Sequence, residues 1–390
     1  MKAMILAAGK GTRVRPLTNV LPKPMIPLIR KPIMEAIIDH LKRHAFDEIY
    51  INTSYLSRSI EDYFRDGDRL GVSMAYSYEG ELVNGEFRDK PLGSAGGMRR
   101  IQDRCGFFDD SFAVLCGDAL IDVDLTEVLR FHRDSGAIAT IVTKPVPRED
   151  VYKYGVVVTD EAGRVQRFQE KPKVNEAASN TINTGIYLFD PKIFDYIPSG
   201  TEFDIGSQLF PRLIEAGEKV CAISLPFEWV DIGCVTDFWE ATRLIMEGKI
   251  KGLKVPGREI RPAVHVGLGV QIADGVTING PVYIGSGTTI ETGVRIDGPA
   301  VIGANCVLRS GSHINQGILG DYTRVSANAM LDKRIVFAGK FIEPNGDAID
   351  LHDANLNWLI DDARKPEEID PAHDDLRETM RQAVPALALA

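Results

Sequence analysis

An unbroken six-residue repeat of aliphatic residues is the feature that most restricts the fold of this 390-residue chain. The repeat runs through Ile260, Val266, Ile272, Ile278, Ile284, Ile290, Ile296, Ile302, Leu308 and Ile314. The residue four positions further on is small or β-branched in most turns, at Val270, Val276, Val282, Thr288, Val294, Ala300, Cys306 and Ser312. A period of six in Ile and Val predicts a parallel β-helix over residues 258–335, in which each aliphatic side chain stacks on its counterpart one coil away.

The part before the repeat has a different period. Short apolar runs, such as 112–116, alternate with amphipathic helical stretches, such as 33–44 and 125–135. This alternation predicts an α/β fold with a doubly wound, mostly parallel sheet, whose ligands lie beyond the carboxyl ends of the strands. Residues 151–245 add further strands, so we expect one domain over 1–250. After the β-helix we expect a tail over 336–390, with a charged helix at 370–384.

A long loop follows the first apolar run, and it carries glycines and cations. Gly9 and Gly11 let backbone N–H groups approach a phosphate closely, and Arg13, Arg15 and Lys23 add positive charge. The loop lacks the third glycine of a dinucleotide fingerprint and the Gly-Lys-Ser/Thr of a Walker loop. Gly-x-Gly after a strand is a weak signal alone, so its meaning depends on the surrounding residues.

Charge and composition exclude several classes of function. The formal net charge is −10 and no basic run occurs, which argues against nucleic acid as the main partner. The five cysteines are scattered without a Cys-x-x-Cys pair, as in proteins of reducing compartments. No apolar run approaches the ~20 residues that span a bilayer. A strand begins directly after Met1, so we expect no signal peptide, no membrane partner and a cytoplasmic location.

Two aspartates are candidates for holding a divalent metal. Asp118 and Asp231 each follow an apolar strand, and two carboxylates at strand ends could share one Mg²⁺. Taken singly, each aspartate is better explained as the cap of a helix or turn. The metal interpretation gains weight only if the loop holds a nucleoside triphosphate.

The complete loop, Leu-x-x-Gly-x-Gly-Thr-Arg-x-x-Pro-Leu-Thr followed by Pro22-Lys23-Pro24, resembles the signature of the sugar-1-phosphate nucleotidyltransferases, or nucleotide-sugar pyrophosphorylases. Motifs similar to those of this family continue in the same order at 154–157, 170–172, 183–187 and 231–233. The resemblance covers residues 1–245. The repeat is similar to the left-handed hexapeptide β-helix that many members carry.

The resemblance implies roles for individual residues. The nucleotide-binding set would be Leu6, Ala7, Ala8, Gly9, Gly11, Thr12, Arg13, Lys23, Gly93 and Ser94. The sugar phosphate would be bound by Gly155, Glu170, Lys171 and Asn183, and Mg²⁺ by Asp118 and Asp231. The residues expected to carry catalysis are Arg13, Lys23, Asp118, Lys171 and Asp231. The implied substrates are a nucleoside triphosphate and a hexose 1-phosphate.

The base and the sugar are less well defined by the sequence. Thymidylyltransferases of this family have a Gln before the Pro-x-Gly turn, and the residue at the corresponding position of this chain is Arg88. Pro91-Leu92-Gly93-Ser94 is similar to the turn of β-type mannose-1-phosphate guanylyltransferases, whereas 116–122 resembles cyanobacterial-type UDP-glucose pyrophosphorylases. We take GTP and mannose 1-phosphate as the first reading, with UTP and glucose 1-phosphate as the alternative.

Two other classes of function stay open. A non-catalytic regulatory homologue would lose loop cations or metal carboxylates, but all five catalytic candidates are present. An acyltransferase in the β-helix would need a catalytic histidine; His265 and His313 lie in the repeat, although a lone His on a coil is more often a packing or surface residue. We expect the β-helix to support a homo-oligomer instead.

Overall fold

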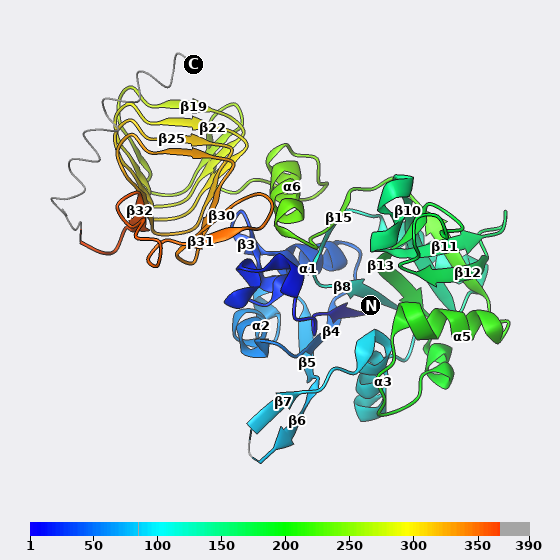
Figure 1. The fold of residues 1–390 in the computed structure, drawn as a ribbon. Helices are drawn as coiled ribbons and strands as arrows, with labels where there is room; N and C mark the ends of the chain where they lie inside the picture. The colour runs from blue at the N-terminus through cyan, green and yellow to red at the C-terminus, as the bar shows by residue number, and fades with distance from the viewer. Residues whose placement is uncertain (85, 367–390) are drawn as a thin grey trace. The chain divides into compact units, whose positions relative to one another are not determined.

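The computed structural model describes residues 1–84 and 86–366 and divides into two compact units (Figure 1). The N-terminal unit comprises Met1–Thr12, Leu21–Ile26 and Pro32–Ile232. The C-terminal unit comprises Arg13–Val20, Pro27–Lys31 and the chain from Gly233 onward. The helix expected at 370–384 lies outside the described residues. Within the described ranges, no helix is long and apolar enough to cross a membrane.

The N-terminal unit is built on a nine-stranded mixed sheet, with the order β12-β11-β13-β8-β1-β4-β5 and with β10 and β14 continuing from β13. Strands β1, β4, β5 and β8 are parallel, and β13 runs antiparallel to β8. The strands are β1 (Lys2–Leu6), β4 (Glu48–Thr53), β5 (Ser73–Tyr78), β8 (Phe112–Cys116), β10 (Ala139–Pro145), β11 (Gly155–Thr159), β12 (Val165–Glu170), β13 (Thr181–Phe189) and β14 (Val220–Ser224). The doubly wound α/β fold predicted from the alternation is confirmed.

Helices and short ribbons complete this unit. The helices are α1 (Ile33–Arg43), α2 (Ser57–Phe64), α3 (Gly93–Cys105), α4 (Leu125–Ser135) and α5 (Phe210–Glu215). Two ribbons are antiparallel pairs, β6 (Gly80–Val83) with β7 (Glu86–Asp89) and β9 (Ala119–Ile121) with β15 (Trp229–Asp231). The ends of α4 show why the sequence folds this way. The side chain of Asp124 accepts hydrogen bonds from the first free N–H groups, and Gly136 ends the helix at a φ of 61°.

The C-terminal unit contains helix α6 (Val235–Met246) and a parallel β-helix whose coils contribute strands to three sheets. The coil strands are β17 (Val264–Val266), β18 (Gln271–Ile272), β19 (Thr277–Asn279), β20 (Val282–Ile284), β21 (Thr289–Ile290), β22 (Arg295–Asp297), β23 (Ala300–Ile302), β24 (Val307–Leu308), β25 (His313–Asn315), β26 (Ile318–Leu319), β27 (Thr323–Val325), β28 (Met330–Asp332) and β29 (Ile335–Phe337). In register, Gln271 lies beside Thr289 and Thr289 beside Val307, so these coils hold 18 residues. The next coil holds 17, because Val307 lies beside Arg324.

The residues of the six-residue repeat fill the interior of the β-helix, except for Ile260, which the sequence analysis assigned wrongly to the stack. Ile284, Ile296, Ile302, Leu308 and Ile314 are fully buried, as are the small residues Thr288 and Ser312 from the second set of positions. Ile260 is 36% exposed instead, because it lies on β16 (Arg258–Arg261), which pairs antiparallel with β17 outside the coils. The six-residue spacing from Ile260 to Val266 therefore does not reflect stacking.

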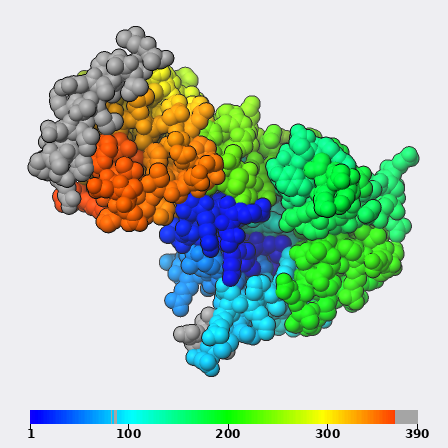
Figure 2. Space-filling view, in the orientation of Figure 1, coloured from blue at the N-terminus to red at the C-terminus, as the bar shows by residue number. Residues whose placement is uncertain are grey.

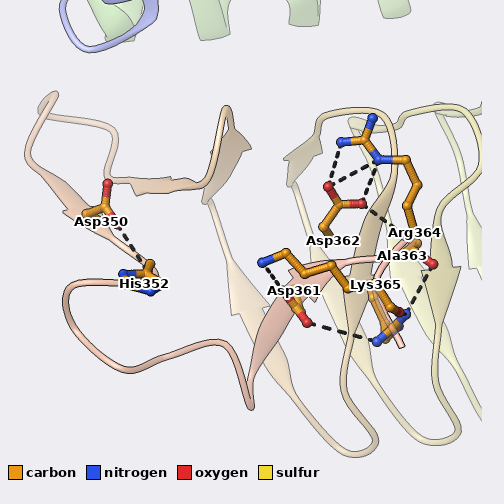
Figure 3. Close-up of polar contacts among 8 residues, drawn as sticks. Asp350, His352, Asp361, Asp362, Ala363, Arg364 and Lys365 are labelled. Carbon is orange, nitrogen blue, oxygen red and sulfur yellow. Dashed lines mark hydrogen bonds and ion pairs between the residues drawn. The ribbon is translucent and has the colours of Figure 1, made fainter. Parts of the chain in front are cut away.

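A C-terminal segment covers the last coils. Strand β30 (Lys340–Ile342) adds antiparallel to β29, and β31 (Ala348–Asp350) adds antiparallel to β30. Strand β32 (Ile360–Asp362) adds antiparallel to β27. The carboxylate of Asp361 lies 3.4 Å from Lys365 and 4.0 Å from Arg324, and Asp362 pairs with Arg364 at 2.5 Å (Figure 3). Figure 2 shows this segment, in red, lying against the orange coils.

Replacing a stacked residue should destabilise the β-helix far more than replacing Ile260. We expect Ile302→Ala to lower the free energy of unfolding by about 2–5 kcal/mol, because it leaves a cavity in a fully buried stack. The matched change Ile260→Ala removes the same atoms from a partly exposed strand and should cost less than half as much. Urea denaturation followed by circular dichroism measures both. Equal losses would contradict the assignment of Ile260 outside the stack.

Candidate active site

The candidate site lies where β1 and β8 end side by side. Leu6 pairs with Cys116 in register, and the chain then turns through Gly117 to Asp118. A Cβ on Gly117 would lie 2.9 Å from the carbonyl oxygen of Leu6 and 3.0 Å from Ile5, so only glycine fits this close approach. The turn brings the Asp118 side chain to the carboxyl edge of the sheet, as the sequence predicts.

Three of the predicted catalytic residues contact one another. Lys23 Nζ lies 2.5 Å from Asp118 Oδ2 and 3.4 Å from Asp231 Oδ1. The ribbon of β9 and β15 explains how residues so far apart in sequence meet, because Asp231 pairs with Ala119 and the N–H of Ile232 bonds to the carbonyl of Asp118. The Lys23 side chain is only 8% exposed, whereas the two carboxylates are 29% and 28% exposed.

The two carboxylates keep Lys23 charged. Burial alone would lower the pKa of this lysine, but the charges of Asp118 and Asp231 outweigh it, so the pKa is raised above 10.5. The ammonium group therefore stays protonated at neutral pH, and the stabilisation that comes from its charge is lost as the pH rises through the raised pKa.

This pair of carboxylates suits a magnesium ion. In the described part of the chain, no group of three or more His, Cys, Asp or Glu side chains could hold a metal. Mg²⁺ does not require such a group, since it often binds one or two carboxylates and takes its remaining ligands from water and substrate phosphates. Asp118 and Asp231 already share one cation, the Lys23 ammonium, and both side chains stay partly exposed. The donor set thus fits the metal expected from the sequence.

The residues expected to bind the sugar phosphate form a second cluster. Gly155 on β11 pairs with Glu170 on β12, and Lys171 Nζ lies 3.4 Å from Glu170 Oε1. A Cβ on Gly155 would lie 2.5 Å from the Phe168 ring and 3.1 Å from Glu170 Oε2. The Lys171 side chain is 59% exposed, so its ammonium is accessible to an anion.

Asn183 lies on β13 and is held by two hydrogen bonds within that strand. Its Nδ2 donates to the hydroxyl of Tyr187, and its Oδ1 accepts the N–H of Gly185. Gly185 has a φ of 74°, and a Cβ there would lie 2.6 Å from Cys116 Sγ, which links this turn to the end of β8. Burial raises the pKa of the Tyr187 hydroxyl well above its usual value, so it stays a neutral hydrogen-bond partner.

Gly93 and Ser94 have structural contacts at the start of α3. Gly93 has a φ of 71°, and a Cβ there would lie 2.6 Å from the carbonyl oxygen of Phe203. Ser94 Oγ donates to Asp204 Oδ2 at 2.8 Å and accepts the N–H of Ile205 at 2.7 Å. These bonds fix the turn, and the expected contact of both residues with base and ribose stays a prediction.

The loop itself is divided between the two units. Ala7, Ala8, Gly9, Gly11 and Thr12 belong to the N-terminal unit, and a Cβ on Gly9 would meet no atom within 4 Å. Arg13 belongs to the C-terminal unit and is exposed. The structure therefore groups Lys23 with the aspartates but does not place Arg13 relative to them.

Sequence reasoning missed a buried network that supports the loop. Asn52 Oδ1 accepts the N–H of Ala7 at 2.8 Å, and Asn52 Nδ2 donates to Glu79 Oε1 at 2.7 Å. Glu79 Oε2 accepts the N–H of Leu92 at 2.9 Å. Both side chains are buried, and burial raises the pKa of Glu79. The signal available was their position, since each is a polar residue at the end of a parallel strand.

His313 makes a polar contact that accounts for its presence in the repeat without a catalytic role. Its Nε2 lies 2.6 Å from Asp297 Oδ2, and Asp297 also accepts hydrogen bonds from Arg295 and Asn279. These four residues form a polar ladder across the outside of neighbouring coils.

Replacing Glu79 should destabilise the loop support. In Glu79→Gln only one oxygen remains to accept from Asn52 or from Leu92, so a buried donor loses its partner at a cost of about 1–3 kcal/mol. The control Glu81→Gln changes an exposed residue paired with Lys90 and should cost no more than about 1 kcal/mol. Urea denaturation measures both variants. If the two variants unfold alike, Glu79 has no supporting role.

Comparison with known proteins identifies the family of the chain. A family model described as nucleotidyl transferase matches residues 2–248. A UTP–glucose-1-phosphate uridylyltransferase of Synechocystis sp. is 53% identical over 365 residues, which cover 93% of this chain and 94% of that protein. The mannose-1-phosphate guanylyltransferase catalytic subunit beta of Xenopus tropicalis is 37% identical over 243 residues, or 61% of this chain and 62% of that protein.

Solved structures point the same way. A structure from Bacillus anthracis, assigned as a glucose-1-phosphate thymidylyltransferase, matches with a TM-score of 0.54 and 26% identity over 63% of this chain and 94% of that one. A UDP-glucose pyrophosphorylase shares the fold at 23% identity and a TM-score of 0.53, over 63% of this chain and 98% of that one. The chain belongs to the nucleotidyltransferase family, and it is an enzyme that transfers a nucleotidyl group to a sugar 1-phosphate.

Proposed function

We propose that the enzyme forms UDP-glucose and pyrophosphate from UTP and glucose 1-phosphate. The observation that carries this proposal is the extent of the similarity to the uridylyltransferase, which continues through the β-helix, whereas that to the guanylyltransferase covers 61% of this chain. The relatives thus favour the alternative over GTP and mannose 1-phosphate, our first reading from the sequence.

The chemistry follows from the charges of the reactants. An oxygen of the sugar phosphate attacks the α-phosphorus of the nucleotide, and the bond from that phosphorus to the bridging oxygen of pyrophosphate breaks. The nucleophile is already an anion, so no protein base is required. The main difficulty is to bring two anions together, which positioned cations overcome by neutralising and orienting them.

Each cation has a proposed task. Lys23, held between two carboxylates, would bind the phosphates of the nucleotide, and Arg13 would bind the departing pyrophosphate. Lys171 would bind the phosphate of the sugar, with Glu170 on the sugar hydroxyls and Gly155 and Asn183 lining its pocket. When Mg²⁺ is bound by Asp118 and Asp231, it would supply charge neutralisation at the transferring phosphate.

A substrate panel tests the proposal. Pyrophosphate release from UTP, GTP, dTTP, CTP and ATP is measured with glucose 1-phosphate and with mannose 1-phosphate in Mg²⁺. We expect UTP with glucose 1-phosphate to be fastest, and EDTA to stop the reaction. A faster reaction of GTP with mannose 1-phosphate would contradict the proposal and support our first interpretation of the sequence. If no substrate pair releases pyrophosphate although the protein binds nucleotide, the protein would be a regulatory homologue.

Asp118→Asn should lower kcat by about 10²–10³, because it removes a charge from the carboxylate pair. The control is Asp122→Asn. The carboxylate of Asp122 accepts the N–H of Glu228, and the amide oxygen of the introduced asparagine can still accept that bond. Steady-state kinetics over a range of Mg²⁺ concentrations measures both. A normal kcat in Asp118→Asn would remove this residue from the mechanism.

Lys171→Ala should raise KM for the sugar phosphate by about tenfold or more, since it removes one charge-assisted contact. The KM for UTP should stay near normal. Lys173→Ala is the matched control, because Lys173 is 79% exposed and pairs only loosely, at 3.6 Å, with Glu176. If the two variants have the same KM for glucose 1-phosphate, Lys171 does not bind the sugar phosphate.

A further inference from the structure

One carboxylate outside the proposed catalytic set joins two segments of the N-terminal unit. Asp204 Oδ2 accepts the hydroxyl proton of Ser94 at 2.8 Å, at the start of α3. Asp204 Oδ1 accepts the N–H of Gly206 at 2.9 Å and the N–H of Ser207 at 2.8 Å, on the segment that follows it. The two oxygen atoms of one side chain therefore hold α3 and a segment 110 residues further along the chain.

The segment after Asp204 has a rare conformation. Ile205–Leu209 forms a π-helical turn, in which the N–H of Leu209 bonds at 2.9 Å to the carbonyl oxygen of Asp204, five residues back. Such turns are uncommon and occur frequently at functional sites. The backbone N–H of Asp204 also donates to Gln208 Oε1 at 2.8 Å, so both the side chain and the main chain of Asp204 fix the start of the turn.

The π turn borders the cluster that we expect to bind the sugar phosphate. A Cβ on Gly206 would lie 3.0 Å from Glu170 Oε2 and 3.4 Å from the Phe168 ring, so glycine lets the turn approach this carboxylate closely. Phe210, directly after the turn, packs against the same Phe168 ring with the centroids 5.2 Å apart. The position of the turn therefore determines the room around Glu170.

On its other side, Asp204 determines how Ser94 can meet a ligand. Ser94 Oγ gives its only proton to Asp204 and accepts the N–H of Ile205 at 2.7 Å. A hydroxyl has one proton and two lone pairs, so Ser94 keeps one lone pair and can only accept a further hydrogen bond. Burial alone would raise the pKa of Asp204, but the hydrogen bonds that it accepts, led by those of Ser207 and Ser94, lower the pKa and keep it charged at neutral pH.

We propose that Asp204 is a positioning residue of the transfer reaction, which holds the nucleotide subsite at Ser94 and the sugar subsite at Glu170 at a fixed separation. In-line attack requires the sugar phosphate and the α-phosphorus to be aligned, and a displacement of about 1 Å can cost about 10² in rate. The inference rests on the proposed function, because the ligand contacts of Ser94 and Glu170 are expectations for that reaction.

Steady-state kinetics of Asp204→Ala tests this role. We expect kcat with UTP and glucose 1-phosphate to fall by about 10², because the two subsites lose their common anchor. The matched control is Asp124→Ala, since Asp124 likewise accepts N–H groups two and three residues further on, at the start of α4. Both substitutions should lower Tm, but only Asp204→Ala should lower kcat. Equal kcat in the two variants would make Asp204 a helix cap alone and overturn the proposal.

Asp204→Asn separates the two halves of the contact. The amide oxygen can still accept the N–H groups of the π turn, whereas the NH₂ group would donate to Ser94 and leave the serine only its proton for a ligand. We expect a Tm near that of the wild type and a kcat about tenfold lower. Ser94→Ala removes the same link from the other side, so the double variant should be no slower than Ser94→Ala alone. Additive losses would contradict a shared role.

Calorimetry gives a readout that does not need turnover. UDP occupies the nucleotide subsite, whereas UDP-glucose reaches both subsites and so senses their separation. The wild type should bind UDP-glucose more tightly than UDP, and Asp204→Ala should reduce the ratio of the two affinities about tenfold while UDP binding changes less. The proposal is overturned if the substitution leaves this ratio unchanged, or if the wild type binds both ligands equally.

The proposed function and this inference can fail separately. If the wild type releases no pyrophosphate from any substrate pair, the proposed function fails, and the calorimetry alone decides whether Asp204 aligns the two subsites. If the wild type is active and Asp204→Ala is as active as Asp124→Ala, the proposed function stands and only the inference fails.

Discussion

The burial of one ammonium group governs how the catalytic unit is built. An unpaired charge as buried as that of Lys23 would cost several kcal/mol, so the fold has to supply carboxylates at the same point. Those carboxylates come from positions 118 and 231, and they meet only because β9 and β15 pair. The pairing in turn needs the tight turn at Gly117, which no larger residue could make. The proposed substrate-binding centre and a folding constraint are therefore the same set of contacts.

Much of the fold could be predicted because its patterns are local. The strand at 112–116 and the helix at 125–135 are found at the predicted residues, since an apolar run or an amphipathic period shows directly in sequence. The six-residue aliphatic repeat likewise predicted the β-helix. Ile260 was assigned wrongly because spacing does not reveal the direction of a strand, and β16 runs antiparallel to the coil beside it.

The support of the site could not be predicted in the same way. Asn52 and Glu79 are 27 residues apart, and they meet because their strands are neighbours and end at the same edge. The contact between Lys23 and the aspartates likewise depends on pairings over distances that no local pattern encodes. Family resemblance named those three residues, but the structure was needed to show that the lysine lies between the carboxylates. Asn52 and Glu79 belong to no motif that the resemblance named.

The antiparallel strands at the end of the β-helix also limit how the chain can assemble. A parallel coil leaves its last strands with unpaired N–H and C=O groups, which can template another chain. Here β30 and β31 continue one sheet as an antiparallel meander, and β32 adds antiparallel to a second sheet, so the final coils do not repeat the geometry that precedes them. The β-helix thus has a built-in polarity. Its repeat can lengthen by duplication of an internal coil, but not by simple stacking of further coils onto this end.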